Sequence, residues 1–394
     1  MNRKKSIWMT IPFLAIVFSF SAFNFISADK SESKAENRAL AQKPIYGKVG
    51  IKAYTGDYEK YYTDQFALRD EFLKLHMKGE ILLGKTNIKG YYLVDDGWIF
   101  QGNSLNLTES KAKEYSDTIN DYGKLLRDNG KEVYYVATPQ KENILISLLP
   151  KFNNSKTLLR NSSRFMSGLN RDDINVINLH DSFNERFTQD KLKDFYFKTD
   201  NHWNSKGAFE GFKIIMDAMS KSSKLKVHIK DESYKTETLK KKEFLGVYNR
   251  NLYEVYPLNE SVPYVYSKAK KPHKYYLHNG EKFQEVDSSK IIATGVKDDV
   301  ISYPTAYTSS SVHYKVVNEA APVDKKLLIY RDSYHSAMSW MFEDIFREVE
   351  VVDPRYIDSS GTSNRKVAES TDADIVLFMF NDLGFVNMID ELKN

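Results

Sequence analysis

Short apolar stretches alternate with helical patterns along most of this chain, and that alternation restricts the fold more than any other feature. Apolar runs of four to six residues occur at 133–137, 174–179, 327–330, 349–352 and 375–380. Helical spacing of apolar residues covers 108–128, 156–170, 205–220 and 335–347. Parallel strands that are buried on both faces have continuous apolar runs, and the helices between them cover both faces of the sheet. The pattern therefore predicts an α/β fold with a parallel central sheet.

The region before this alternation has a different pattern. Residues 54–83 carry apolar side chains at helical spacing, which predicts a long helical segment. Two apolar runs within 91–100 are separated by Asp95-Asp96-Gly97, a sequence typical of a hairpin turn. We therefore expect helices first, then a hairpin, and then the α/β domain.

Residues 222–322 interrupt the alternation and are rich in Tyr, Lys and Ser. Short strand-like pieces at 262–266 and 275–277 predict a β-rich insertion. The insertion is basic, through Lys240, Lys241, Lys242, Lys268, Lys270, Lys271 and Lys274. A solvated excursion is the simpler interpretation, and a lip that contacts an anionic wall polymer is the alternative.

The N-terminus predicts export. Arg3, Lys4 and Lys5 precede an uncharged run from Ser6 to Ala28, which is long enough to cross a bilayer as a helix. The basic flank places the following chain outside the cytoplasm. We predict a transmembrane signal anchor at 1–28, a juxtamembrane linker and helical region at 29–90, and a catalytic domain at 91–394 on the extracytoplasmic side of the cell membrane. A cleaved signal peptide is the alternative, and it exports the domain equally.

Composition removes several classes of function. The 394 residues include no cysteine, which excludes thiol catalysis, disulfides and cysteine-based zinc sites. The net charge of +4 is small for this length, and no nucleic-acid-binding motif occurs. Only eight histidines are present, none in an H-E-x-x-H pattern, so we predict neither a metal site nor a cofactor.

Two segments carry residues suited to acyl transfer. Asp200 and His202 lie two residues apart, directly before a predicted helix, so that the carboxylate can orient the imidazole. Ser333 follows the apolar run 327–330 and precedes a predicted helix, which places it at the carboxyl edge of the sheet. The alternatives are a structural Asp–His pair and a serine that caps a helix.

An ordered set of motifs resembles the bacterial polysaccharide O-acetyltransferases of the SGNH-hydrolase-like class. That class includes the alginate acetylation proteins, the DHHW-motif proteins and the Gram-positive cell-wall acetyltransferases of the PatB type. The similar segments are Glu36-Asn37-Arg38-Ala39-Leu40 with Pro44, Phe66-Ala67-Leu68-Arg69-Asp70, Asp96-Gly97-Trp98-Ile99-Phe100, Pro139-Gln140-Lys141-Glu142, Thr199 to Asn204, Arg331-Asp332-Ser333-Tyr334 and Val352 to Tyr356.

The resemblance implies an SGNH-hydrolase-like three-layer sandwich and a catalytic triad. Ser333 corresponds to the nucleophile, His202 to the general base and acid, and Asp200 to its orienting partner. The backbone N–H of Ser333 is the oxyanion candidate, and Arg331 stands where many relatives have glycine, which leaves the rest of the oxyanion hole open. Candidate substrate-binding residues are Trp203, Lys141 and Arg331, each with a structural alternative.

The implied activity is a serine-dependent O-acetyltransferase that acts on a cell-wall or extracellular polysaccharide. The resemblance also implies a membrane-bound O-acyltransferase partner that supplies the acetyl groups. A carbohydrate acetylesterase of the same fold is one alternative, because the triad serves water as readily as a sugar. A non-catalytic wall-binding scaffold is the other.

Overall fold

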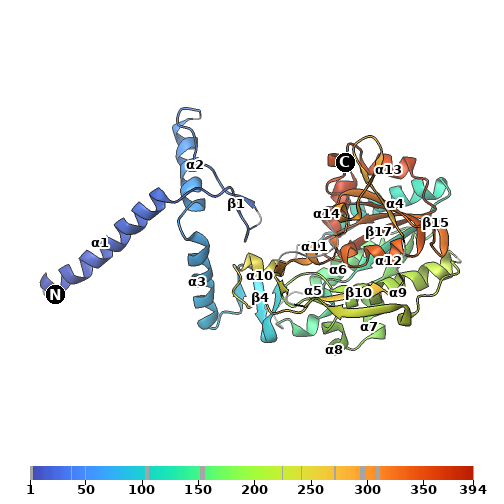
Figure 1. Ribbon diagram of the computed structural model, residues 1–394, viewed down its shortest axis with the longest axis horizontal. Coiled ribbons are helices and arrows are strands. Elements are labelled where there is room, and N and C mark those ends of the chain that lie inside the picture. The colour runs from blue at the N-terminus through green and yellow to red at the C-terminus, as the bar shows by residue number, and fades with distance from the viewer. Residues whose placement is uncertain are drawn as a thin grey trace. The chain divides into compact units, whose positions relative to one another are not determined.

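The computed structural model divides into two compact units, and the structure describes most of both (Figure 1). The small unit comprises 1–89 and 249–256, and the large unit comprises 90–248 and 257–394. The sequence-based boundaries at 28, 90, 222 and 322 stay predictions. Lys241, Lys270, Lys271 and Asn37 lie outside the described residues. The described residues are 3–36, 38–48, 50–102, 106–150, 156–223, 225–240, 242–269, 272–292, 299–307 and 311–393.

The predicted membrane segment folds as α1 (Arg3–Ile26), a helix with Pro12 inside it. Polar residues interrupt its apolar sequence at Thr10, Ser19, Ser21 and Asn24. Within the described ranges, no helix combines the length and apolar character that crossing a bilayer requires. The membrane-spanning helix in the predicted fold class is therefore not supported.

The predicted helical segment 54–83 consists of two helices in the small unit, α2 (Ile51–Asp64) and α3 (Arg69–Leu82). The break falls at Leu68, whose φ of 57° is left-handed and cannot continue a helix. The short strands β1 (Glu32–Ser33) and β2 (Arg38–Ala39) pair antiparallel, and β3 (Asn87–Ile88) follows α3.

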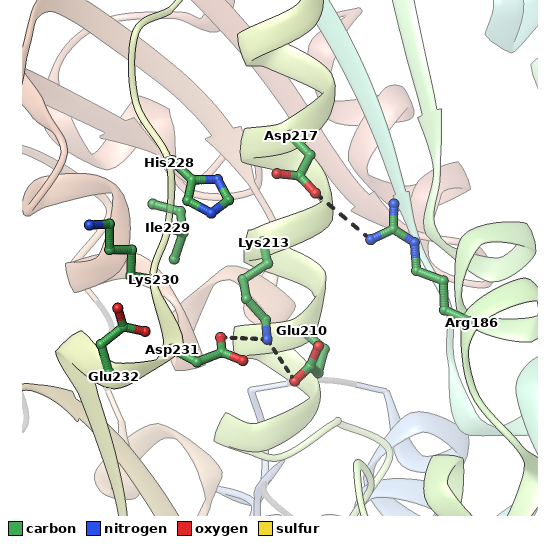
Figure 2. A pocket seen from close by; sticks show the side chains of 9 residues that line it. All are labelled: Arg186, Glu210, Lys213, Asp217, His228, Ile229, Lys230, Asp231 and Glu232. Atoms are coloured by element: carbon green, nitrogen blue, oxygen red, sulfur yellow. Dashed lines mark hydrogen bonds and ion pairs between the residues drawn. The ribbon is translucent and has the colours of Figure 1, made fainter.

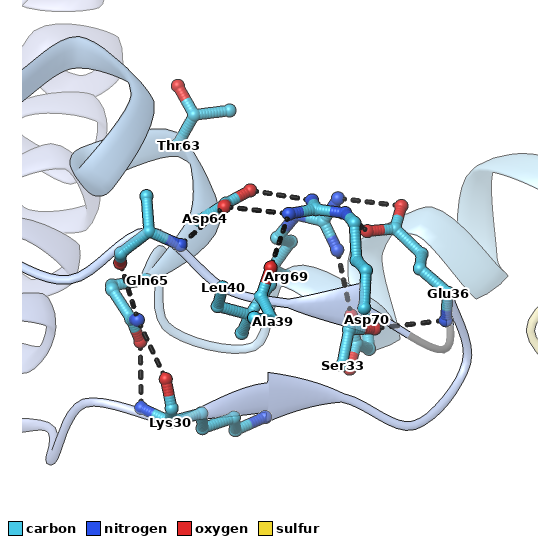
Figure 3. A network of polar contacts seen from close by, with 12 residues as sticks. Lys30, Ser33, Glu36, Ala39, Leu40, Thr63, Asp64, Gln65, Arg69 and Asp70 are labelled. Atoms are coloured by element: carbon cyan, nitrogen blue, oxygen red, sulfur yellow. Dashed lines mark hydrogen bonds and ion pairs between the residues drawn. The ribbon is translucent and has the colours of Figure 1, made fainter. Parts of the chain in front are cut away.

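Ion pairs hold the small unit together (Figure 3). Both terminal guanidinium nitrogens of Arg38 donate to the carboxylate of Asp64, at 2.8 and 2.7 Å. These hydrogen bonds are the main reason that the pKa of Asp64 falls to about 2. Arg69 pairs with Glu36 at 2.9 Å, and the Tyr253 hydroxyl donates to the same carboxylate at 2.6 Å. Motif residues from two separated segments thus brace this unit.

A mixed eight-stranded sheet forms the centre of the large unit, in the order β12-β11-β14-β16-β15-β17-β6-β7. Neighbouring strands from β16 to β7 pair in parallel, as the apolar runs predict. The parallel strands are β6 (Glu132–Thr138), β7 (Asn175–Asn178), β15 (Val323–Arg331), β16 (Phe346–Val352) and β17 (Ile375–Asn381).

Helices cover both faces of this sheet. Alternate residues of β6 enter opposite cores: Tyr134 and Val136 lie in one, whereas Val133, Tyr135 and Ala137 lie in the other. The first core includes residues of α7 (Leu179–Arg186), α9 (Ser205–Ser222) and α12 (Ser339–Glu343). The second includes residues of α4 (Glu109–Asp128), α6 (Lys156–Ser167), α13 (Asn364–Ser370) and α14 (Phe385–Leu392). The layers are therefore helices, sheet and helices.

The region predicted as an insertion contributes directly to the central sheet. β11 (Lys274–His278) and β14 (His313–Val317) extend the sheet beyond β16 as antiparallel strands, and β12 (Phe283–Val286) forms the edge. Other parts pair outside it: β8 (Tyr234–Thr238) with β10 (Pro263–Ser267), and β9 (Glu243–Phe244) with β13 (Val300–Ile301). The sheet is thus mostly, rather than wholly, parallel.

One local prediction is wrong, and another is confirmed. The predicted helix 335–347 is wrong: the chain forms η5 (Ser333–Ala337) and the five-residue α12, and Phe346 already begins β16. The predicted hairpin is present as β4 (Tyr91–Val94) and β5 (Trp98–Gln101), which pair antiparallel around η1 (Asp95–Gly97).

The remaining short helices are α5 (Lys141–Ile144), η2 (Ile146–Leu148), α8 (Gln189–Lys193), η3 (Asp231–Ser233), α10 (Val247–Asn251), η4 (Ser288–Lys290), α11 (Tyr303–Ala306) and η6 (Ile357–Ser360).

Candidate active site

Ser333 is the first residue of η5, directly beyond the carboxyl end of β15. Asp332 caps this turn, because its carboxylate accepts a hydrogen bond from the Tyr334 N–H at 2.8 Å. The other oxygen of Asp332 accepts the N–H and the side-chain amide of Asn381, both at 2.6 Å. Since Asn381 ends the neighbouring strand β17, Asp332 fixes the turn that carries Ser333 to the edge of the sheet.

Asp200 and His202 lie on the loop between α8 and α9. The loop folds back on itself, because the N–H of Phe197 donates to the His202 carbonyl at 3.3 Å and that of Asn204 to the Phe195 carbonyl at 2.7 Å. The side chain of Asn204 then caps α9 by accepting from the N–H groups of Lys206 and Gly207. The loop is thus fixed at both ends.

The two segments bring Ser333, His202 and Asp200 into one line of hydrogen bonds. His202 Nε2 lies 2.7 Å from Ser333 Oγ, and His202 Nδ1 lies 2.6 Å from Asp200 Oδ1. Asp200 and His202 are buried, and Ser333 is half-buried. This is the arrangement in which an imidazole removes the serine proton while a carboxylate holds its tautomer. The catalytic roles of these three residues stay predictions.

Asp200 is held in its charged form. Burial alone would raise its pKa, but His202 and the backbone N–H groups of Val247 and His202 hold the pKa below the ordinary value of 3.8. The N–H of Val247 donates to Asp200 Oδ2 at 2.7 Å. Gly246 lets this segment approach, because a Cβ there would lie 2.3 Å from the carbonyl oxygen of Thr199. An ionised Asp200 can therefore stabilise a cationic imidazole.

Two tyrosine rings pack against the imidazole, and the sequence analysis assigned neither of them a role. The ring of Tyr303, from α11, stacks on His202 with centroids 3.8 Å apart and planes 6° apart. Tyr334 lies on another side, with its centroid 5.1 Å from that of His202. Its hydroxyl donates to the Asn201 carbonyl at 2.6 Å, which ties the histidine loop to the serine turn.

The backbone N–H of Ser333 meets one requirement of an oxyanion donor. It belongs to the first residue of η5, and no acceptor among the described residues engages it. An N–H at the start of a helical turn can bind developing negative charge. Its function as an oxyanion donor stays a prediction.

The predicted substrate-binding residues make contacts within the protein, and their binding of substrate stays a prediction. Trp203 is fully buried, and its indole N–H donates to the Tyr334 carbonyl at 2.9 Å. Lys141 is fully buried too, and its ammonium donates to the carbonyls of Phe197 and Lys198 at 3.1 and 2.7 Å. Burial lowers the pKa of Lys141 to about 8. The Lys141 contacts fix the chain that precedes Asp200, and the Trp203 contact ties the residue after His202 to the turn that carries Ser333.

Arg331 is also held within the protein. Its guanidinium pairs with Asp353 at 2.9 Å and donates to the Ser311 carbonyl at 2.9 Å. Arg355 contacts the same carboxylate at 2.7 Å. Arg331, the last residue of β15, thus joins this strand to Asp353, directly after β16.

A large hollow outside the triad carries charges that neutralise one another (Figure 2). It has a volume of about 510 Å³ and lies along the outer side of α9. Lys213 pairs with Glu210 at 3.1 Å and with Asp231 at 2.8 Å, and Arg186 faces Asp217 at 3.9 Å. Across the described ranges, no group of three or more His, Cys, Asp or Glu side chains is arranged to hold a metal ion.

Solved structures similar to this chain share its fold. The structure of Bacillus cereus PatB1 has a TM-score of 0.66 and 23% sequence identity, and the match covers 74% of this chain and 96% of that one. A second PatB1 structure, with a sulfonyl adduct, has a TM-score of 0.65, 22% identity and the same coverage. A DHHW family protein from Eubacterium siraeum has a TM-score of 0.59 and 20% identity over 78% of this chain and 96% of that one. None of the curated proteins matches this chain.

The three layers around a mostly parallel central sheet are those of an SGNH-hydrolase-like protein. Residues 93–295, more than half of the chain, match the family described as the SGNH hydrolase-like domain of the acetyltransferase AlgX. The chain belongs to this family of acetyltransferases. The resemblance drawn from the sequence motifs is therefore confirmed.

Proposed function

We propose that the protein is an extracytoplasmic O-acetyltransferase that places acetyl groups on hydroxyls of a cell-wall or extracellular polysaccharide. The observation that carries the proposal is the line of hydrogen bonds from Ser333 through His202 to Asp200. Membership in an acetyltransferase family supports acetyl as the transferred group.

In the first half-reaction, Ser333 Oγ attacks the carbonyl carbon of an acetyl donor. His202 Nε2 takes the serine proton, and Asp200 stabilises the imidazolium that results. The tetrahedral oxyanion collapses, the bond from the carbonyl carbon to the leaving group breaks, and His202 returns the proton to that group. The product is acetyl-Ser333.

In the second half-reaction, a sugar hydroxyl takes the acetyl group. His202 Nε2 removes the hydroxyl proton as the sugar oxygen attacks the acetyl-serine carbonyl. A second tetrahedral intermediate forms and collapses, and His202 protonates the departing Ser333 Oγ. We assign the N–H of Ser333, at the start of η5, to stabilising the oxyanion in both halves.

Water can replace the sugar hydroxyl in the second half-reaction, which would make the protein an acetylesterase. The same three residues serve either acceptor, so the acceptor has to be identified by its product. Family membership favours transfer over hydrolysis.

The location and the donor are parts of the proposal. The basic residues 3–5 before an uncharged run to Ala28 support export of the large unit. A membrane-bound O-acyltransferase is the proposed partner, since an extracytoplasmic enzyme needs acetyl groups carried across the membrane. N-terminal sequencing of protein from the cell envelope distinguishes a retained N-terminus from a cleaved one, and protein found only in the cytosol would contradict export.

The test is intact-mass measurement after incubation with p-nitrophenyl acetate. We expect one acetyl adduct, mapped by peptide sequencing to Ser333 and absent in Ser333→Ala. That variant should lose roughly 10⁴- to 10⁶-fold in turnover. Ser336→Ala, in the same short helix, is the matched control. An adduct that persists in Ser333→Ala would refute the mechanism, and release of acetate without any acetylated sugar would identify an esterase.

A further inference from the structure

The two residues that precede the triad carboxylate, Lys198 and Thr199, are held through all of their backbone polar groups. The Lys198 carbonyl accepts a hydrogen bond from the Lys141 ammonium at 2.7 Å, and the Thr199 carbonyl accepts one from the Tyr248 N–H at 3.1 Å. The N–H groups of both residues donate to a single side chain, the carboxylate of Glu260. This stretch of chain is therefore fixed on both sides.

Glu260 lies between α10 and β10, is half-buried, and uses both of its carboxylate oxygens. Oε1 accepts from the Lys198 N–H, and Oε2 accepts from the Thr199 N–H at 3.1 Å and the Thr199 hydroxyl at 2.7 Å. Burial raises the pKa of Glu260, and the hydrogen bonds from these two residues and the charge of Lys141 counteract part of that rise. A carboxylate suits this position because both of its oxygens accept, whereas an amide accepts through one atom only.

The grip on Thr199 bears on the hydrogen bond between Asp200 and His202. Asp200 follows Thr199 directly, so a shift of the Thr199 peptide group moves the Asp200 carboxylate. That carboxylate contacts His202 Nδ1 at 2.6 Å and the His202 N–H at 3.1 Å through one oxygen. Small displacements of groups that orient reacting atoms have large effects on rate. Glu260 can therefore influence the imidazole through the chain that it holds.

Glu260 is one of three contacts that the region 222–322 makes with the histidine loop. The Val247 N–H donates to the other oxygen of Asp200 at 2.7 Å, and the Tyr303 ring stacks on His202. The three residues hold the peptide groups, the carboxylate and the imidazole, respectively. The region that interrupts the alternating sequence pattern thus supports the acid–base pair.

We propose that Glu260 is a positioning residue, which sets the distance and direction of the Asp200 carboxylate from His202 by holding the peptide groups of residues 198 and 199. The assignment rests on the proposed function, because it concerns the pair that activates Ser333 there. Glu260 acts through the chain and not on the acetyl donor. Its loss should therefore slow the chemical step and leave donor binding unchanged.

The test is Glu260→Gln in the full chain. The amide is close in size, but it cannot accept from both Lys198 and Thr199, because its nitrogen only donates. We measure acetyl-Ser333 formation from p-nitrophenyl acetate by quenched-flow mass spectrometry, at a temperature where circular dichroism shows every variant folded. We expect the maximal rate to fall roughly 10- to 100-fold, and the half-saturating donor concentration to change less than about twofold.

Asp374→Asn is the matched control for a loss of stability alone. Asp374 is half-buried directly before β17, at the opposite edge of the sheet from Ser333, and its carboxylate accepts the Lys326 N–H at 2.7 Å. We expect a lower Tm and an unchanged maximal rate in this variant. An equal fall of the maximal rate in Asp374→Asn and Glu260→Gln would overturn the positioning role.

A second pair of variants covers the case in which Glu260→Gln does not fold. Thr199→Ala removes the hydroxyl that donates to Glu260, whereas Thr199→Ser keeps it. We expect Thr199→Ala to lose rate in the same direction as Glu260→Gln, but less, and Thr199→Ser to restore the wild-type rate. Equal rates in Thr199→Ala and the wild type would overturn the proposal in that case.

A spectroscopic measurement separates this proposal from the acetyl-transfer mechanism. The Nδ1–H proton of His202, bound to Asp200, is observed by proton NMR without any donor and is assigned by its absence in His202→Gln. We expect its resonance to shift in Glu260→Gln and to stay unchanged in Asp374→Asn. If Ser333 of the wild type is acetylated, a rate in Glu260→Gln within threefold of the wild type overturns the positioning role. If Ser333 is never acetylated, the proposed function fails, and the resonance alone decides: a shift upholds the role of Glu260 and no shift overturns it.

Discussion

The imidazole of His202 lies flat against the phenol ring of Tyr303, with ring centroids 3.8 Å apart and planes 6° apart. This stacking fixes the plane of the imidazole, and in that plane Nε2 points to Ser333 and Nδ1 to Asp200. An aromatic face also attracts a cation, so the imidazolium formed during catalysis gains more from the contact than the neutral ring does.

Replacing Tyr303 should therefore separate stacking from hydrogen bonding. We expect Tyr303→Leu to lower kcat for p-nitrophenyl acetate about 10-fold, on the scale of 1–2 kcal/mol for a desolvated cation–π contact. Tyr303→Phe should retain most activity, because it keeps the ring against His202 and removes only the hydroxyl, which contacts the Tyr334 carbonyl at 3.5 Å and the backbone of Ala337. Equal activity in all three proteins would show that stacking does not position the base.

The sequence predicts the three triad residues but not the tyrosine ring that stacks on His202, and the reason is physical. Asp200 and His202 are close in the chain, and Ser333 follows an apolar run, so each has a local signal. Tyr303 is one of 26 tyrosines and lies in a region without a regular pattern. Its position against His202 results from packing of α11, which no local spacing predicts.

The fold was predictable where strands are buried on both faces. The runs that became β6, β7, β15, β16 and β17 are continuous and apolar, whereas β11 and β14 mix polar and apolar residues and were assigned to an insertion. The helix expected over 335–347 failed because Met338 and Phe346, apolar at helical spacing, are buried by two short turns and by the start of a strand.

Asp200→Asn tests the orientation of the imidazole. An amide cannot stabilise the imidazolium and can invert the tautomer, so we expect kcat to fall roughly 10²- to 10⁴-fold. The measurement is the rate of acetyl-Ser333 formation by quenched-flow mass spectrometry. Asp190→Asn, a side chain 91% exposed on α8, is the control. A loss of less than threefold in Asp200→Asn would remove Asp200 from the mechanism.

Lys141→Met distinguishes a structural lysine from one that binds substrate. Methionine matches its length but leaves the carbonyls of Phe197 and Lys198 without the ammonium donor, so we expect unfolding free energy to fall by about 1–3 kcal/mol. Urea denaturation measures this change. The KM for an oligosaccharide acceptor should change less than threefold. A large rise in KM with unchanged stability would instead return Lys141 to the acceptor site.

Glu343 should make the stability of the large unit depend on pH. It is 2% exposed at the end of α12, and among the described residues nothing bonds to its Oε2. Burial, followed by the neighbouring charge of Asp344, raises its pKa from 4.5 to about 8. The folded state thus keeps a proton that the unfolded state releases, and this contribution to stability, complete below pH 4.5, is lost as pH rises to about 8.

Glu343→Gln removes the titrating carboxyl, so the folded and unfolded states no longer bind different numbers of protons at this position. Between pH 4.5 and about 8, each pH unit lowers the free energy of unfolding of the wild type by up to about 1.4 kcal/mol through this group. The variant lacks this loss, so its stability relative to the wild type should rise with pH. We expect similar Tm values near pH 4.5 and a higher Tm for the variant at pH 8, measured by circular dichroism. Glu369→Gln, half-exposed on α13, should follow the wild-type curve. Parallel curves for Glu343→Gln and wild type would mean that Glu343 is already ionised in the folded protein, because only a retained proton produces the difference in slope.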